Sequence, residues 1–262
     1  MTQLTRLLGI MQRLRDPQTG CPWDREQTIE SLAPFTVEEA YEVVDAIQSG
    51  DLKSLQGELG DLLFQVVFYA QIGQEKGAFT FEDICRGISE KLEHRHPHIY
   101  ADAQTGNSEQ MLAQWESIKR KERAEKAQHS ALDDIPLAFP ALMRAQKIQK
   151  RCASVGFDWT TLGPVVEKVH EEIDEVMFEA QQAVVDEAKL EEEVGDLLFA
   201  TVNLARHLGT KAEVALQKAN KKFERRFRQV ESIIHAQGLK MEDASLDTME
   251  SAWQQVKQLE KS

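Results

Sequence analysis

Carboxylates at helical spacing are the residues of this chain that could carry out chemistry. In the second half of the sequence, Glu172 and Glu175 are three residues apart, and so are Glu193 and Asp196. Residues three or four apart project from the same face of an α-helix. If the two helices run antiparallel, joined by the short polar segment 181–187, the four carboxylates converge. Four converging negative charges repel one another strongly, so we expect a bound cation.

The expected cation is Mg²⁺, with Mn²⁺ as a substitute, because every candidate ligand is an oxygen. Such a site usually takes phosphate oxygens of the substrate as further ligands. The pattern therefore points to hydrolysis of a phosphate ester or phosphoanhydride, in which the metal polarises a phosphoryl oxygen and stabilises the leaving group. A lone E-x-x-E pair is more typical of a solvated helix face. Two pairs beside an apolar run, present twice in the chain, favour a site.

The first half of the chain carries a second possible metal site with nearly the same spacing. Its acids are Glu39, Glu42, Glu58 and Asp61. The motif E-L-G-D-L-L-F, which begins at the third of these acids, returns as E-V-G-D-L-L-F in the second half. Downstream, K-L-E-H-R is echoed by K-F-E-R-R. Blocks in the same order at a nearly constant offset indicate duplication of one structural unit.

Apolar residues recur at three- and four-residue spacing in both halves, and alternating strand patterns are nearly absent. The predicted fold is all-α, with two tandem helical-bundle units. A charged segment follows Lys121 and ends in the helix-start and breaker residues D-D-I-P. This predicts domains at 1–130 and 131–262.

The two halves differ one helical turn before their acids. The second half has Lys168 and Lys189 at these positions, where the first half has Phe35 and Ser54. Lysines there would clamp the phosphate oxygens of such a substrate and stabilise charge in the transition state. Ordinary ion pairing, at about 0.2–0.5 kcal/mol, is the alternative for each lysine alone. We hypothesise that 131–262 is the catalytic domain and that 1–130 is weak, differently specific or architectural.

Further residues are candidates for binding or catalysis beside the second set of acids. Glu171 adjoins Glu172, and we expect these two to be the catalytic acids, with Glu171 orienting the attacking water. A solvated acid, or one that only supports the metal ligands, is an equal alternative for Glu171. Trp253 is a candidate for stacking on a base, although a Trp packed between helices is an equal alternative. The basic candidates for phosphate contact downstream of the acids are Lys222, Arg225 and Arg226.

Gly60 and Gly195 interrupt the acid-bearing helices at equivalent positions. Glycine inside a helix costs about 1 kcal/mol relative to alanine. Its presence in both halves predicts a close approach of another helix, or a ligand near the backbone.

Composition excludes several broad classes of function. The 262 residues carry 31 Lys and Arg against 44 Asp and Glu, a formal charge of −13, which argues against stable nucleic-acid binding. Three scattered cysteines favour neither a disulfide framework nor a zinc site. No apolar run approaches the ~18 residues of a membrane span, and the N-terminus has no signal-peptide core. We expect a cytoplasmic protein.

The sequence E-E-x-x-E followed by E-x-x-D resembles the signature of the MazG-type all-α nucleotide pyrophosphohydrolases. The stretches C-P-W-D at 21–24 and R-H-P-H at 95–98 extend the resemblance over nearly the whole chain. It implies that these acids bind Mg²⁺ and that a nucleoside triphosphate is converted to the monophosphate and pyrophosphate. It also implies a homodimer whose helices complete each other's core.

Three alternatives stay open from the sequence. A di-iron carboxylate bundle would need two Glu-x-x-His motifs, whereas Glu93-x-x-His96 is a single instance remote from the acids. A non-enzymatic helical interaction module would use the acids only as a solvated face. A pyrophosphohydrolase of narrow specificity, for deoxynucleotides or phosphoribosyl nucleotides, would carry the same motifs.

Overall fold

The computed structural model describes residues 2–101, 107, 110–111, 114–115, 117–119, 122 and 130–260. These residues form helices, turns and loops, with no β-strand among them, so the predicted all-α fold is confirmed. The chain divides into two compact units, Met1–Glu122 and Arg123–Ser262, called here the N-terminal and C-terminal units. The sequence-based boundary near residue 130 stays a prediction.

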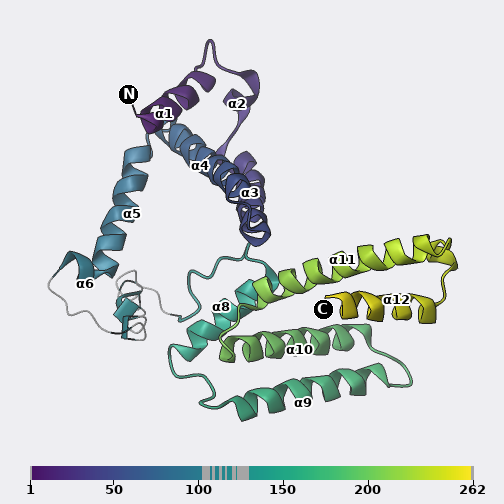
Figure 1. Ribbon diagram of the computed structural model, residues 1–262. Coiled ribbons are helices and arrows are strands. Elements are labelled where there is room, and N and C mark those ends of the chain that lie inside the picture. The colour runs from purple at the N-terminus through teal and green to yellow at the C-terminus, as the bar shows by residue number, and fades with distance from the viewer. Residues whose placement is uncertain are drawn as a thin grey trace. The chain divides into compact units, whose positions relative to one another are not determined.

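Six helices of the N-terminal unit are described (Figure 1). They are α1 (Gln3–Leu14), α2 (Pro22–Glu26), α3 (Ile29–Ser49), α4 (Leu52–Glu75), α5 (Phe81–Arg95) and α6 (Pro97–Tyr100).

Helices α3 and α4 form a hairpin whose ends are set by local sequence. The Thr28 hydroxyl accepts the backbone N–H of Ser31, and the Ser31 hydroxyl accepts that of Thr28, which is a capping box at the start of α3. Gly50 ends α3 in the left-handed conformation at φ 75°. The Asp51 carboxylate then accepts the first free N–H groups of α4. The tight turn places the two acid-bearing helices side by side.

Five α-helices and one 3₁₀ turn are described in the C-terminal unit, and they follow the same plan. They are α8 (Ala141–Ala153), α9 (Leu162–Ala180), α10 (Glu187–His207), α11 (Ala212–Ala236), η1 (Met241–Asp243) and α12 (Leu246–Leu259). Helices α9 and α10 lie side by side as an antiparallel hairpin, and α12 lies along α11 (Figure 1). Asp186 caps α10 as Asp51 caps α4.

Each unit has a small core of its own. In the N-terminal unit, α1, α3 and α4 bury a cluster of side chains made up of Met11, Leu32, Val67, Phe68 and Ile72. In the C-terminal unit, α11 and α12 bury a second cluster, made up of Val230, Ile234, Ala252 and Val256. Neither cluster contains the acids, and the second lies on helices other than the acid-bearing α9 and α10.

Apolar side chains also remain exposed beside the acids. Leu59 and Leu63 of α4 are 49% and 40% exposed, and their counterparts Val194 and Leu198 of α10 are 40% and 54% exposed. In both units the stripe predicted as core is therefore only partly covered by the chain itself. None of the helices in the described part of the chain combines the length and apolar character needed to cross a membrane.

Candidate metal centre

Helices α9 and α10 bring three of the four predicted acids of the C-terminal unit together. Glu172, Glu175 and Glu193 each offer a carboxylate oxygen, and these oxygens lie within 4.8 Å of one another. Glu172 and Glu175 come from adjacent turns of α9, and Glu193 comes from the facing turn of α10. We call these three residues the C-terminal acid cluster. Its geometry matches what the i, i+3 spacing on two antiparallel helices predicts.

Asp196, the fourth predicted ligand, stands outside this group of mutually close oxygens. It lines a neighbouring cavity together with Glu172. Asp196 is exposed, so its side chain has room to turn toward the cluster. Its role as a ligand stays a prediction.

Glu172 is the buried member of the cluster. Its residue is 4% exposed, and its Oε2 is buried with no hydrogen-bond partner among the residues that the structure describes. A buried, unpaired carboxylate oxygen is costly unless a ligand or ion pairs with it. Burial, followed by the charge of Glu172, raises the pKa of Glu175 above its usual value. Three oxygen donors and an unpaired buried oxygen fit a hard divalent cation.

Lys168 provides the positive charge nearest to the cluster. Its Nζ lies 2.6 Å from Oε1 of Glu172 and donates a 2.9 Å hydrogen bond to Oε1 of Glu171. These two acids raise the pKa of Lys168, and that ammonium group stays charged throughout the neutral range. The predicted phosphate-binding lysine and the two predicted catalytic acids are thus in direct contact.

A cavity of about 650 Å³ opens beside the cluster, between α8, α9 and α10. The charged end of the cavity is lined by one base, Lys168, and two acids, Glu172 and Asp196. Aromatic rings and neutral amides line the rest, among them Phe157, Trp159, Phe199, Gln149 and Asn203. This mixture of apolar walls and a few polar groups is typical of small-molecule sites.

Asp158 ties the loop at the cavity mouth to α10. Its carboxylate accepts hydrogen bonds of 2.9 and 2.5 Å from Arg206, and it lies 3.0 Å from Nε2 of His207. The Arg206 hydrogen bonds, ahead of the contact with His207, lower the pKa of Asp158 below its usual value. Arg206 also donates to Oδ1 of Asn203 at 2.9 and 2.8 Å. The network fixes the loop that carries Phe157 and Trp159.

A second, more open hollow of about 760 Å³ lies on the other side of the cluster. Acidic side chains dominate its lining, which includes Glu171, Glu175 and Glu193. The C-terminal acid cluster therefore separates an aromatic cavity from an acidic groove.

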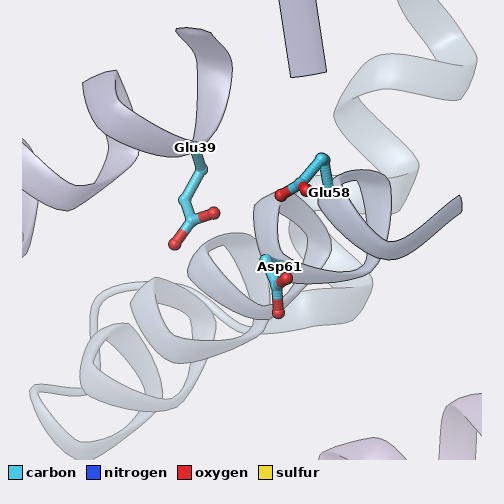
Figure 2. A group of neighbouring side chains, drawn as sticks. All are labelled: Glu39, Glu58 and Asp61. Carbon is cyan, nitrogen blue, oxygen red and sulfur yellow. The ribbon is translucent and has the colours of Figure 1, made fainter. Parts of the chain in front are cut away.

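The N-terminal unit repeats the arrangement with a different choice of acids. Carboxylate oxygens of Glu39, Glu58 and Asp61 lie within 4.8 Å of one another, and we call these residues the N-terminal acid cluster. Figure 2 shows Glu39 extending from one helix toward the two acids of the other. Glu42 stands outside this group, so three of the four predicted ligands converge here too. Burial, followed by the charges of Asp61 and Glu42, raises the pKa of Glu39.

The other basic residues predicted to contact the substrate are either exposed or paired with Glu260. Lys189 and Lys222 are exposed. Arg225 and Arg226 both donate to Glu260, at 2.6 Å for Arg225 and 2.9 and 2.6 Å for Arg226. The role of all four residues in phosphate binding stays a prediction.

Trp253 belongs to a packed aromatic group. The centroid of its ring lies 5.2 Å from that of Phe223, and the guanidinium of Arg226 lies over the ring. The Trp253 side chain also packs against the buried cluster of α11 and α12. The ion pair of Arg226 with Glu260 has a counterpart in that of Arg95 with Glu122 in the N-terminal unit. The duplication predicted from sequence therefore extends to this contact.

The predicted close helix approach at Gly60 and Gly195 is wrong within the described chain. A Cβ atom added at either glycine would meet nothing within 4 Å. The neighbouring helix of each hairpin passes on another face, and the glycine face is open. The second expectation, a ligand near the backbone, stays a prediction.

Sequence reasoning missed the cavity residues Gln149, Asp158, Asn203 and Arg206. Asn203 and Arg206 share helical spacing on α10, but Asp158 and Arg206 meet only through the tertiary fold. A usable signal was the stretch G-F-D-W at 156–159, where Gly156 adopts φ 91° before two aromatic residues.

The chain is similar to a known protein family and to characterised relatives. The family model described as the MazG nucleotide pyrophosphohydrolase domain matches residues 27–100 and 161–231, once in each unit. The chain is 72% identical over 260 residues to the nucleoside triphosphate pyrophosphohydrolase of Escherichia coli (strain K12), covering 99% of both chains. It is 45% identical over 251 residues to the nucleoside triphosphate pyrophosphohydrolase/pyrophosphatase MazG of Thermotoga maritima, covering 96% of this chain and 94% of that one.

Proposed function

Because this chain belongs to the MazG nucleotide pyrophosphohydrolase family, we propose that it hydrolyses nucleoside triphosphates to the monophosphate and pyrophosphate at the C-terminal acid cluster. The resemblance inferred from the carboxylate pattern is confirmed by the family match. The observation that carries the assignment to this cluster is the contact of Lys168 with Glu171 and Glu172 beside the cavity.

The proposed cofactor is Mg²⁺, held by Glu172, Glu175 and Glu193, with Asp196 turning in as a fourth ligand. The fit rests on the three close oxygens and on the buried, unpaired Oε2 of Glu172. When bound, the cation offsets charge on the phosphates and polarises a phosphoryl oxygen. Mn²⁺ is expected to substitute because it accepts the same ligands.

The chain's own residues then have distinct tasks. Lys168 neutralises the buried acid before substrate arrives, and it can turn to the non-bridging phosphate oxygens when a cation takes its place at Glu172. Glu171 is exposed, so its carboxylate can accept the proton of the attacking water. Lys189, Lys222, Arg225 and Arg226 remain proposed contacts for the rest of the triphosphate.

The nucleoside fits the aromatic side of the cluster. The cavity of about 650 Å³ has Phe157 and Trp159 at its mouth, 82% and 43% exposed. A base can stack on such rings whatever its identity, while the amides of Gln149 and Asn203 can read its polar edge. With the nucleoside there, the phosphates extend toward Lys168 and the acids. Trp253 stays an alternative stacking residue.

We also propose a homodimer. On α9, Ile173 and Met177 are 40% and 48% exposed, and on α10, Val194 and Leu198 are 40% and 54% exposed. Pairs four residues apart on neighbouring helices form a continuous apolar face beside the acids. Such a face on a single chain marks an interaction surface, and the open face at Gly195 leaves room for a helix of a second copy.

The test is a panel of nucleoside and deoxynucleoside triphosphates incubated with Mg²⁺, with pyrophosphate and orthophosphate measured separately. We expect pyrophosphate and the monophosphate in equal amounts. Orthophosphate as the first product would mean attack at the terminal phosphorus and would contradict the proposed reaction. The same panel measures base and sugar preference.

A further inference from the structure

Two arginines of the C-terminal unit share one carboxylate. Oε1 of Glu260 accepts a 2.6 Å hydrogen bond from Nη2 of Arg225, and Oε2 accepts bonds of 2.9 and 2.6 Å from Nε and Nη2 of Arg226. The bonds from Arg226, ahead of the bond from Arg225, lower the pKa of Glu260 to about 2, so this carboxylate is ionised at neutral pH. Two guanidinium groups that converge on one carboxylate form a site for an anion.

The N-terminal unit has a single arginine in the corresponding contact. Arg95 binds both oxygens of Glu122, through Nε at 3.1 Å and through Nη2 at 2.5 Å. His94 stands at the position of Arg225, and its Nε2 lies 4.0 Å from Glu122. One arginine is therefore enough to hold this carboxylate. The second arginine of the C-terminal unit adds a positive charge that the single negative charge of Glu260 does not balance.

The contact with Glu260 can open without disturbing the core. Glu260 follows the last residue of α12, whereas α12 packs on α11 through the buried cluster of these two helices. The Arg225 side chain is 61% exposed, and exposed ion pairs contribute little to stability. Each guanidinium has five N–H donors, and Glu260 accepts three hydrogen bonds from the pair. Among the contacts that the structure describes, donors therefore remain for an incoming anion.

We propose that Arg225 and Arg226 form a binding site for a diphosphate group, and that the carboxylate of Glu260 is a built-in competitor for this site. The diphosphate is the group that a triphosphate substrate and released pyrophosphate have in common. The inference rests on the proposed function in one respect, that these arginines contact the phosphates. Binding of the diphosphate requires Glu260 to leave the arginines.

Charge favours the diphosphate over the carboxylate. Pyrophosphate carries about three negative charges at neutral pH, whereas Glu260 carries one. Glu260 has the advantage of being attached to the chain, which gives it a high effective concentration at the arginines. A site that the carboxylate leaves free in about one molecule in ten binds its ligand about tenfold more weakly than an open site. Removal of the Glu260 charge should therefore tighten the binding of a diphosphate.

The first test is a calorimetric titration of the full-length protein with inorganic pyrophosphate in the absence of metal. We expect Glu260→Gln, which removes the charge and keeps the shape of the side chain, to bind pyrophosphate about tenfold more tightly than the unaltered chain. Adding Arg225→Gln to this variant should abolish the gain. Glu250→Gln, an exposed acid of α12 with the same change in net charge, is the control and should change the affinity less than about twofold.

Two results of this titration overturn the proposal. One is pyrophosphate binding in Glu260→Gln that is unchanged or weaker. The other is an equal gain in Glu250→Gln, which would make the effect one of net charge alone.

A second measurement uses the unaltered chain and does not depend on the folding of a variant. Hydrogen exchange of the backbone amides of residues 257–260 is compared with and without pyrophosphate. Displacement of Glu260 should loosen this end of α12 and speed the exchange of these amides. Exchange that is unchanged or slower would show that Glu260 stays on the arginines, and would overturn the competitor.

The outcome is separable from the proposed catalytic function. In steady-state kinetics with Mg²⁺, KM for the triphosphate should fall about tenfold in Glu260→Gln, whereas a side chain that only positions the arginines would give a higher KM and overturn the proposal. Tighter pyrophosphate binding in Glu260→Gln, in a chain that releases no pyrophosphate from triphosphates, would contradict the proposed reaction and still support the competitor. Catalysis with unchanged pyrophosphate binding in Glu260→Gln would do the reverse.

Discussion

Lys168 Nζ lies 2.6 Å from Oε1 of Glu172, one turn away on α9, and Glu172 is the buried acid of its cluster. The Lys168 ammonium group supplies the positive charge beside Glu172. Its second ion-pair partner, Glu171, lines the acidic groove. This relationship distinguishes the C-terminal unit from the N-terminal unit, where Phe35 stands at the equivalent position.

Replacing Lys168 by Met should impair substrate binding. The change removes the positive charge nearest to the acids and leaves repulsion between them and the triphosphate. We expect KM for the triphosphate to rise about tenfold, with partial recovery in Lys168→Arg, since a charged hydrogen bond contributes roughly 1.5–3 kcal/mol. The KM of each variant is measured by steady-state kinetics at saturating Mg²⁺. An unchanged KM in Lys168→Met would mean that Lys168 only pairs with the neighbouring acids and does not bind the substrate.

The stabilising effect of Mg²⁺ should grow with pH. In the metal-free protein the pKa values of Glu175 and Glu39 are raised above the usual 4.5, mainly by burial. Their contribution to stability is therefore present below pH 4.5 and is lost as the pH rises through their folded values. Mg²⁺ binds only the ionised groups and relieves their repulsion.

The measurement is the rise in Tm caused by Mg²⁺, compared at pH about 5 and about 7.5. We expect the larger rise at the higher pH. A Mg²⁺ effect that is equal at both values, or larger at acid pH, would show that these carboxylates do not bind the metal.

Asp158→Asn should destabilise the C-terminal unit and widen the cavity mouth. The Asp158 side chain is 25% exposed and Arg206 16%, so the pair is only partly screened by solvent. We expect the free energy of unfolding to fall by about 1.5–3 kcal/mol. Because the pKa of Asp158 is lowered from 3.8, its contribution is present above that value and is lost as the pH falls below it.

Urea unfolding at neutral pH and near pH 3 checks this expectation. The difference between wild type and Asp158→Asn should shrink at the lower pH. A difference that persists unchanged would mean that the Asp158 charge does not hold the loop.

Leu198→Glu should dissociate the proposed dimer. Leu198 is 54% exposed on the apolar face of α10, and a carboxylate there would be buried without a partner at a helix interface. Sedimentation velocity should show a dimer for the unaltered chain and a monomer for the variant. Val184→Glu is the matched control, because Val184 lies in the loop between α9 and α10 and is 87% exposed. A monomeric unaltered chain would contradict the homodimer.

The sequence was sufficient for the features that repeat along one helix. Spacing placed Glu172 beside Glu175, and the motif after Glu193 placed the facing helix. It could not say which acid of each set stands apart, because the rotation of each helix depends on how the hairpin packs. Asp196 is set apart in one unit and Glu42 in the other.

Tertiary contacts between distant segments lay outside the reach of spacing. Asp158 meets Arg206 across the mouth of the cavity, and neither belongs to a repeated motif. The two arginines expected at the phosphates instead pair with Glu260, and their contact with substrate depends on a ligand being present. The open face at Gly195 likewise depends on what covers it, which is a property of the assembly.

The central claim, that the C-terminal acid cluster is the catalytic metal centre, is tested most directly by comparing Glu172→Gln with Glu39→Gln in the full-length protein. Glu191→Gln, an exposed acid of α10, controls for the change in charge. Pyrophosphate release with Mg²⁺ is measured for all three.

We expect Glu172→Gln to lower kcat/KM at least about 100-fold, since loss of even an outer partner of a metal ligand costs 10–100-fold. Glu39→Gln should retain most of the activity, because it lies in the other unit. Equal losses from Glu172→Gln and Glu39→Gln, or a fully active Glu172→Gln, would contradict the account.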